Sequence, residues 1–247
     1  MSAFEGSWPG KWPAMRIVCF GANGATGRLA VKQALGEGHV VTAFTRHPEA
    51  FPLRDDRLQL VGGDVFDPSS VDKAVSGQGA VLSSVGVPFG RKPITVFSQG
   101  MAHIVQAMQH HGVRRLVCVS ATPADPRYDT QGGFIFEKVM KPVISHTLGR
   151  TMYADLRRME NLVRHSDLDW TILRPSGLFQ ALSISDYQVT DGFVAGQYTS
   201  RTDLADCMLR QLDDDRNVRK ILAVATVSGQ PTFLKFFLSE GIGKKAA

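Results

Sequence analysis

The chain has 247 residues, of which 43% are hydrophobic and 21% are charged, and its formal net charge is +5. These values are typical of a folded globular protein and exclude a disordered or collagen-like chain. Lys and Arg are scattered rather than gathered into a stripe, so nucleic acid is not an expected partner. No apolar run reaches the roughly 18 residues of a membrane-spanning helix, and the start lacks a signal-peptide core, so we expect a cytoplasmic protein without a membrane partner.

The first half of the chain alternates short apolar runs with longer amphipathic ones. Residues 1–14 are rich in Gly, Pro and Trp and are expected to form a flexible extension. The predicted strands that follow are Arg16–Phe20, Val40–Thr45, Leu58–Gly62, Ala80–Val85 and Leu116–Ser120. The helices predicted between them are Gly27–Glu37, Ser70–Ser76 and Thr95–His111. This alternation predicts an α/β fold with a doubly wound parallel sheet, the Rossmann arrangement.

The second half of the chain differs in composition, and it begins with a loop rich in Pro, Asp and Gly after Ser120. The elements predicted there are a helix over Tyr153–His165, a strand over Trp170–Arg174, a weaker strand near Tyr187, a helix over Asp203–Leu212 and a strand over Ile221–Thr226. Open α/β sheets bind ligands at the carboxyl ends of their strands. We therefore expect residues 15–247 to form one domain, in which segments 121–150 and 176–247 contribute a small substrate cap over that edge.

Three glycines at a spacing of three residues separate the first predicted strand from the first helix. Gly21 would let the chain turn sharply, Gly24 would remove a side chain where a phosphate approaches, and Gly27 would let the helix sit close to the sheet. A pyrophosphate is held well by the free N–H groups and positive dipole end of a helix. Because strand, turn, helix and strand follow within about 30 residues, the pattern predicts a dinucleotide site.

The residues after the second strand predict which dinucleotide is bound. An acid there would accept the ribose hydroxyls of NAD, whereas an Arg would pair with the additional phosphate of NADP. The chain offers Arg46 and no acid before Glu49, with Arg28 as a second cation. We therefore predict NADP(H), the alternative being that Arg46 is only a solvated surface charge. Asp64 and Val65, after the third strand, are candidates for contact with the adenine.

Several motifs in fixed order resemble the atypical short-chain dehydrogenase/reductase superfamily, in its NAD(P)H-binding branch. The motifs are "FGANGATG", "FTRHPE", "GGDVFD", "LVCVSA", "DLDWTILRPSGL" and "SRTDLADCMLRQL". The narrower resemblance is to the flavin reductase and biliverdin-IXβ reductase group and to NmrA-like proteins. It implies a Rossmann fold that binds NADPH through Gly21, Asn23, Gly24, Ala25, Thr26, Gly27, Arg46, Asp64, Val65, Val85 and Gly86. It also implies that Ser120 is the active-site serine, the alternative being a strand-end serine that caps a turn.

The chain departs from conventional members in lacking a Tyr four residues before a Lys. Tyr153 is followed at that spacing by Arg157, whereas alignment through Glu160 puts Met152 and Leu156 at the two positions. Tyr153 is therefore a candidate acid, the alternative being core packing or a contact at the start of the helix. Arg174 is expected to pair with Glu160 on the preceding helix rather than to contact a substrate.

Three functions remain open from the sequence. The first is an NADPH-dependent oxidoreductase that transfers hydride to a small planar or carbonyl acceptor, such as a flavin, quinone or ketone. The second is a non-catalytic NADP(H) sensor of NmrA type, and the third is an epimerase or isomerase. His110 and His111 are expected only to stabilise the C-terminal end of their helix, where a positive charge is favourable. No metal is therefore predicted.

Overall fold

The computed structural model describes residues 13–88, 92–125, 149–194, 198–232 and 236. Nearly all of the predicted N-terminal extension and most of the first predicted cap segment lie outside these residues. The same holds for the end of the second cap segment.

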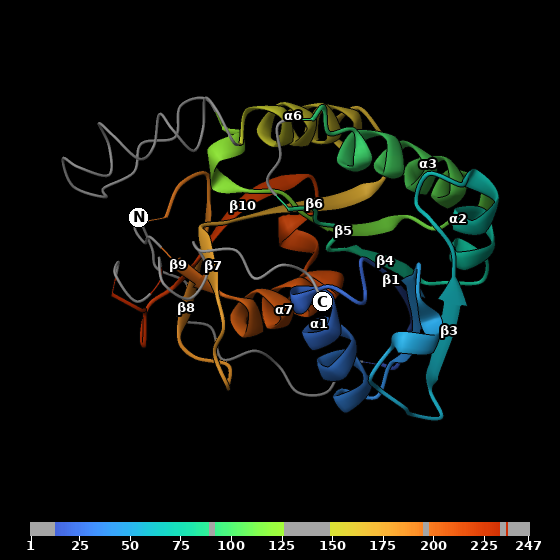
Figure 1. The fold of residues 1–247 in the computed structure, drawn as a ribbon, viewed down its shortest axis with the longest axis horizontal. Helices are drawn as coiled ribbons and strands as arrows, with labels where there is room; N and C mark the ends of the chain where they lie inside the picture. Colours follow the sequence, from blue (N-terminus) through green and yellow to red (C-terminus); the bar gives the residue numbers. More distant parts are fainter. Residues whose placement is uncertain (1–12, 89–91, 126–148, 195–197, 233–235, 237–247) are drawn as a thin grey trace.

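The centre of the fold is an eight-stranded sheet in the order β3-β2-β1-β4-β5-β6-β10-β8 (Figure 1). Its strands are β1 (Arg16–Phe20), β2 (Val40–Thr45), β3 (Leu58–Gly62), β4 (Ala80–Ser83), β5 (Arg115–Val119), β6 (Asp169–Pro175), β10 (Lys220–Thr226) and β8 (Tyr187–Asp191). All neighbours pair in parallel except β8, which is antiparallel to β10. The order in which the chain adds strands reverses between β1 and β4, and such sheets bind their ligands at that point.

Helices cover both faces of this sheet. One face carries α2 (Pro68–Val75), α3 (Val96–His111) and α6 (Arg150–Arg164), and the other carries α1 (Ala25–Gly36) and α7 (Arg201–Arg210) (Figure 1). Each layer has its own apolar core against the sheet. The three cysteines are buried in these cores, and burial raises the pKa of the Cys19 thiol to about 12. The predicted doubly wound α/β fold is confirmed.

The structure corrects several predicted boundaries. α1 begins at Ala25 and α6 at Arg150, and both starts are earlier than predicted. Each follows a glycine without a side-chain cap, so the sequence carries no polar signal for the start. β4 ends at Ser83 rather than Val85, because the chain then leaves the sheet and passes over Gly21.

A small second sheet lies at the carboxyl ends of β6 and β10. It pairs β7 (Gly177–Phe179) with β9 (Tyr198–Ser200), and neither three-residue strand was predicted. The Thr199 hydroxyl donates to Val224 O at 2.7 Å and accepts from Ser176 N at 3.0 Å, which ties this sheet to the two long strands. That this segment caps a substrate remains a prediction.

A buried carboxylate on α6 holds the first turn of α3. Asp155 is fully buried, and its Oδ2 accepts from the backbone N–H groups of Phe97 at 2.9 Å and Ser98 at 3.2 Å. Its Oδ1 accepts from Ser98 Oγ at 2.5 Å and from the half-exposed Arg158 at 3.1 Å. Thr95, the residue before α3, makes no capping bond with its own side chain. Asp155 therefore supplies the N-terminal cap of α3 from another helix.

We expect Asp155→Ala to lower the free energy of unfolding by about 2–3 kcal/mol, because it leaves buried N–H groups without an acceptor. Arg158→Ala removes only the exposed partner of the same carboxylate and should cost less than about 1 kcal/mol. Denaturant unfolding of both variants measures the difference, and equal losses would contradict the capping role.

Candidate dinucleotide site and its acceptor edge

Two of the three glycines are required by the way the turn folds on itself. Gly21 has a φ of +75°, and a Cβ there would lie 2.7 Å from the backbone of Ser84 and Val85. A Cβ on Gly27 would collide with the carbonyl oxygen of Gly21. Both positions therefore exclude a side chain even without a ligand, because β1, α1 and the end of β4 approach closely there.

Gly24 differs, because the fold itself leaves room for a side chain. Its N–H donates to Gly21 O at 3.0 Å, and an added Cβ would lie 3.2 Å from that oxygen, which needs only a small shift. Gly24 and Ala25 are exposed at the start of α1, whereas Thr26 is buried. Among the described residues no side chain caps this helix, and its first turn carries no acidic residue. The turn therefore presents backbone donors and a positive helix end to solvent, which suits a pyrophosphate.

Two arginines lie on the segments that flank the turn. Arg46 is exposed directly after β2, and the nearest acid along the chain, Glu49, contacts His47 at 3.3 Å. Arg28 donates through Nε to Asn23 Oδ1 at 2.9 Å, and within the described residues its two terminal nitrogens make no hydrogen bond. The residue directly after β2 is therefore an exposed cation, and that it pairs with a 2′-phosphate remains a prediction.

Residues of α3 pack against the segment that follows β3. Asp64 Oδ1 accepts from Phe66 N at 3.0 Å, and His103 Nδ1 lies 2.8 Å from the carbonyl oxygen of Val65. A Cβ on Gly100 would lie 3.0 Å from the Val65 side chain, so glycine lets α3 pack closely there and a larger residue would require the Val65 side chain to shift. The sequence reasoning missed His103 and Gly100, since neither belongs to a local motif. That Asp64 and Val65 contact an adenine remains a prediction.

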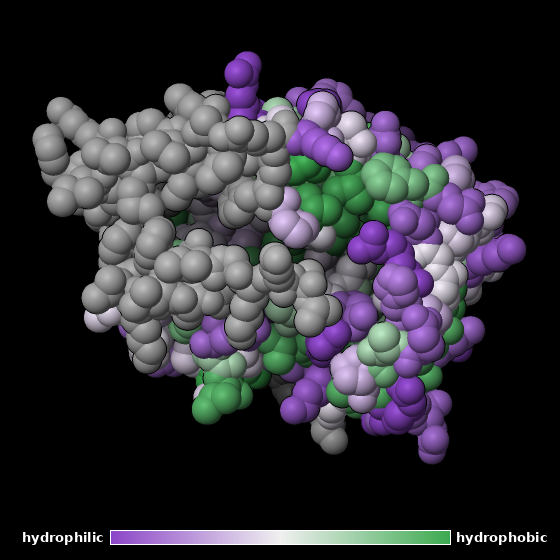
Figure 2. Space-filling model, in the orientation of Figure 1, coloured by the Kyte–Doolittle hydropathy of each residue, from purple (hydrophilic) through white to green (hydrophobic). Residues whose placement is uncertain are grey.

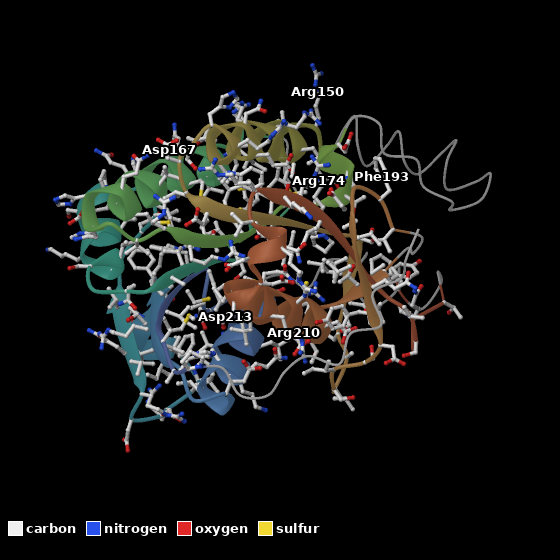
Figure 3. All side chains as sticks on the ribbon, turned by 180° about the vertical axis from the view of Figure 1, so that it is seen from behind. Arg150, Asp167, Arg174, Phe193, Arg210 and Asp213 are labelled. Atoms are coloured by element: carbon white, nitrogen blue, oxygen red, sulfur yellow. The ribbon has the colours of Figure 1, made fainter. Side chains whose placement is uncertain are left out.

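Ser120 stands directly after β5 and belongs to a buried ionic network. Its hydroxyl donates to Glu160 Oε1 at 2.6 Å. Arg174 binds the same carboxylate with two nitrogens, at 2.9 and 2.6 Å, and Asp125 Oδ2 with a third, at 2.7 Å. The pairing of Arg174 with Glu160 predicted from the sequence is confirmed, and Figure 3 labels Arg174 below α6. The link from Glu160 to Ser120, 40 residues earlier, had no signal in the sequence.

The network fixes the chemical character of this edge of the sheet. Burial opposes the charge of Arg174, but its contacts with Glu160 and Asp125 leave its pKa above the ordinary value. The Thr122 hydroxyl lies 2.8 Å from the carbonyl oxygen of Pro175 and 3.1 Å from that of Arg174, and it joins the loop after β5 to the end of β6. Because a hydroxyl has one proton and Ser120 gives it to a carboxylate, its remaining capacity is as an acceptor.

Tyr153, the other candidate catalytic residue, is buried among the apolar residues of α3, α6 and the sheet. Leu156 is also buried in that core, and Met152 packs against it. Both side chains are apolar, so neither position that alignment assigns to the Tyr/Lys pair holds a titratable group. Arg157 is exposed.

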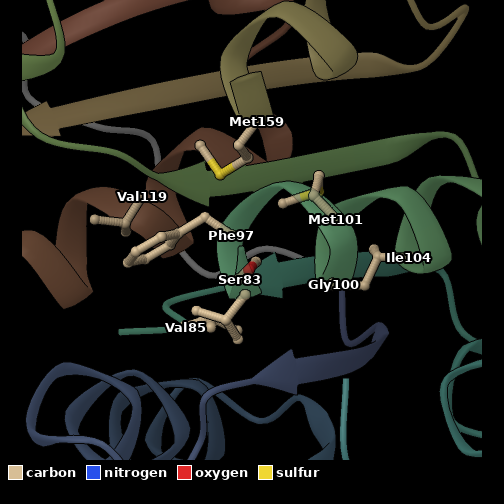
Figure 4. A pocket seen from close by; sticks show the side chains of 9 residues that line it. Ser83, Val85, Phe97, Gly100, Met101, Ile104, Val119 and Met159 are labelled. Carbon is tan, nitrogen blue, oxygen red and sulfur yellow. The ribbon is translucent and has the colours of Figure 1, made fainter. Parts of the chain in front are cut away.

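A small apolar hollow lies between α3 and the carboxyl ends of β4 and β5 (Figure 4). It is lined by Ser83, Val85, Val96, Phe97, Gly100, Met101, Ile104, Val119 and Met159, none of which is ionisable. Figure 2 shows an apolar patch on the surface beside α3, bordered by polar side chains. Of the predicted contacts in this region, Val85 lines the hollow and Gly86 is exposed next to it.

A glycine turn between the first strand and first helix of a doubly wound parallel sheet defines a dinucleotide-binding Rossmann protein. A family profile described as NAD(P)H-binding matches residues 21–215, and the chain belongs to that family. This confirms the branch that the sequence motifs resemble.

The chain is similar to an uncharacterised chloroplastic protein of Arabidopsis thaliana, with 28% identity over 66% of this chain and 59% of that protein. It is 23% identical to the photosystem II assembly factor Ycf39 of Synechocystis over 71% of this chain and 48% of the factor. The chain therefore matches only about half to three fifths of the length of these relatives.

Solved structures share the fold at low identity. A short-chain dehydrogenase/reductase of Veillonella parvula in complex with NADP superposes with a TM-score of 0.72 at 19% identity, over 89% of this chain and 99% of that one. The protein ChuY of Escherichia coli, described as an anaerobilin reductase, superposes with a TM-score of 0.70 at 20% identity, over 88% and 100%. Within the described part of the chain, no helix combines the length and apolarity needed to cross a membrane.

We expect Gly24→Val to abolish dinucleotide binding while a cooperative thermal melt is kept, because the fold tolerates the side chain but an approaching phosphate does not. Gly36→Val, at the exposed far end of the same helix, is the matched control and should bind normally. Calorimetric titration with NADPH and NADH measures both, and intact binding by the Gly24 variant would disprove the assignment.

Proposed function

We propose that the protein is an NADPH-dependent reductase that transfers hydride to a small planar or carbonyl acceptor such as a flavin, a quinone or a ketone. The observation that carries the choice of cofactor is the exposed Arg46 after β2, at a strand end without a carboxylate. A cytoplasmic location and a small-molecule partner belong to the same proposal.

In this proposal, different residues of the site bind different parts of the cofactor. The backbone N–H groups at the start of α1 bind the pyrophosphate, and Arg46, with Arg28 beside the turn, pairs with the 2′-phosphate. Asp64 and Val65 contact the adenine, and Val85 and Gly86 pass beside the ribose. The bound dinucleotide supplies the hydride. The relative solved with NADP and the one described as an anaerobilin reductase support this reading.

The acceptor edge favours one class of substrate over another. Ser120 gives its proton to Glu160, so it offers lone pairs to a ligand rather than a hydrogen-bond donor. A planar acceptor that carries N–H groups, such as a flavin, matches an acceptor oxygen better than a ketone does. None of the described residues that line the apolar hollow is an acid, so in this proposal the proton comes from solvent or from the substrate itself.

A second candidate is a non-catalytic sensor that binds NADP(H) and changes its affinity for a partner. It is favoured by the apolar Met152 and Leu156, which replace the proton-transfer pair. It is also favoured by the hydrogen bond that Ser120 donates to Glu160, because that proton is then not available to a substrate. The relative named as an assembly factor supports it as well.

Arg46→Ala should weaken NADPH binding by about 1.5–3 kcal/mol, tenfold or more, and leave NADH nearly unchanged, because only NADPH carries the phosphate. Arg164→Ala removes an exposed arginine at the end of α6 and should change neither affinity. Calorimetry with both cofactors decides the matter: equal losses, or a wild type that prefers NADH, would remove the NADP assignment.

Ser120→Ala should lower turnover with little change in NADPH affinity, whereas Tyr153→Phe should change turnover less than about tenfold, below what general acid catalysis contributes. The size of the Ser120 effect separates the acceptor classes. Loss of a bond to a substrate N–H costs about tenfold, while loss of a donor to a developing oxyanion costs about 10²–10³-fold.

Steady-state rates with a panel of flavins, quinones and ketones measure both variants. An inactive Tyr153→Phe beside an active Ser120→Ala would reverse the assignment. A wild type that binds NADPH tightly but reduces no member of the panel would favour the sensor.

A further inference from the structure

Three potential metal ligands meet where α2 packs against the end of α3. Asp72 lies on α2, and His110 and His111 are the last two residues of α3. Asp72 Oδ1 is 2.8 Å from His110 Nδ1 and 3.1 Å from His111 Nε2. All three ligand atoms lie within 4.8 Å of one another, the only such group among the described residues.

The contact with His111 is unusual for a simple hydrogen bond. Its Nε2 is buried and, within the described part of the chain, has no hydrogen-bond partner of adequate geometry, although the carboxylate oxygen is 3.1 Å away. A buried ring nitrogen that faces an oxygen off the hydrogen-bonding direction is left without compensation for its lost hydration. A cation placed between the two atoms would supply that compensation.

The spacing fits ligands of one small cation. Two ligands at about 2.0–2.1 Å from a tetrahedral ion lie about 3.3 Å apart. The observed separations of 2.8 and 3.1 Å are shorter, so the side chains would move apart by a few tenths of an ångström to admit the ion. Two imidazoles and one carboxylate make a set that suits Zn²⁺ and its first-row neighbours rather than Ca²⁺ or Mg²⁺, which prefer oxygen. His110 is 69% exposed, so water can reach the site and complete the coordination.

We propose that Asp72, His110 and His111 form a binding site for a divalent transition metal ion of the Zn²⁺ class. The ion would join α2 to the end of α3, and the prediction of no metal from the sequence would then be wrong. The site would be structural, since its ligands lie at the opposite end of α3 from Phe97, which lines the apolar hollow.

The cysteines do not compete for the metal in the folded protein. All three are buried, and burial raises their pKa values, so the thiolates that bind zinc do not form readily. Metal binding that survives loss of His111 would therefore have to come from other groups.

The test is titration of the metal-stripped full chain with Zn²⁺ by calorimetry and with Co²⁺ by visible absorption, which reports four-coordinate geometry. We expect one ion per chain in the wild type and at least about tenfold weaker binding in His111→Ala and in Asp72→Asn. His165→Ala removes a surface histidine at the end of α6 and is the matched control, expected to bind as the wild type does.

A melt in the presence of metal gives a second readout that does not depend on cofactor or activity. With free Zn²⁺ about 100-fold above Kd, the Tm of the wild type should rise by about 5–10 °C, and that of His111→Ala should not. Absence of saturable 1:1 binding, or equal affinity in the wild type and His111→Ala, would overturn the proposal. Either result leaves the proposed reductase function untouched.

Discussion

The buried charge of Arg174 is the constraint on which the acceptor edge of the sheet depends. A guanidinium is costly to bury unless its donors are matched, and Glu160 and Asp125 match three of them. These partners come from α6 and from the loop after β5, so the network holds three segments in one arrangement. Removing one of these carboxylates would leave part of the buried charge of Arg174 uncompensated. Breaking a buried ion pair in this way lowers the free energy of unfolding by about 3–5 kcal/mol. Ser120 is oriented by the same carboxylate, so the geometry of the candidate acceptor site is set by ionic pairing rather than by its own loop.

The cofactor half of the site rests on different physics. There the essential groups are backbone N–H donors, and the side chains matter chiefly by being absent, as at Gly21 and Gly27. Such a site is formed by a few consecutive residues, which is why the glycine spacing predicted it. The Ser120–Glu160–Arg174 network joins residues up to 54 positions apart, so the sequence could indicate the pairing of Arg174 but not the fate of the Ser120 proton.

The same distinction explains which parts of the fold were predictable. β1, β2 and β3 match their predicted bounds because strands buried in a parallel sheet are continuous apolar runs between turn residues. The starts of α1 and α6 were placed too late because Gly24 and Gly149 carry no capping side chain. β7 and β9 are three residues long, too short for any periodicity, and their place depends on Thr199 bonding to β10. The cap of α3 by Asp155 was also out of reach, since the helix and its cap are 57 residues apart.

α3 connects these separate features, because each part of it serves a different neighbour. Asp155 holds its first turn, where Phe97 lines the apolar hollow, and Gly100 and His103 in its middle support Val65. A rigid helix held at its first turn keeps the segment after β3 and the apolar hollow in fixed relation. None of the described residues that line the hollow is ionisable, so under the proposed function they orient an acceptor but do not protonate it. Under the proposed reductase function, hydride transfer is then the demanding step at this edge, and protonation is left to water or to the acceptor itself.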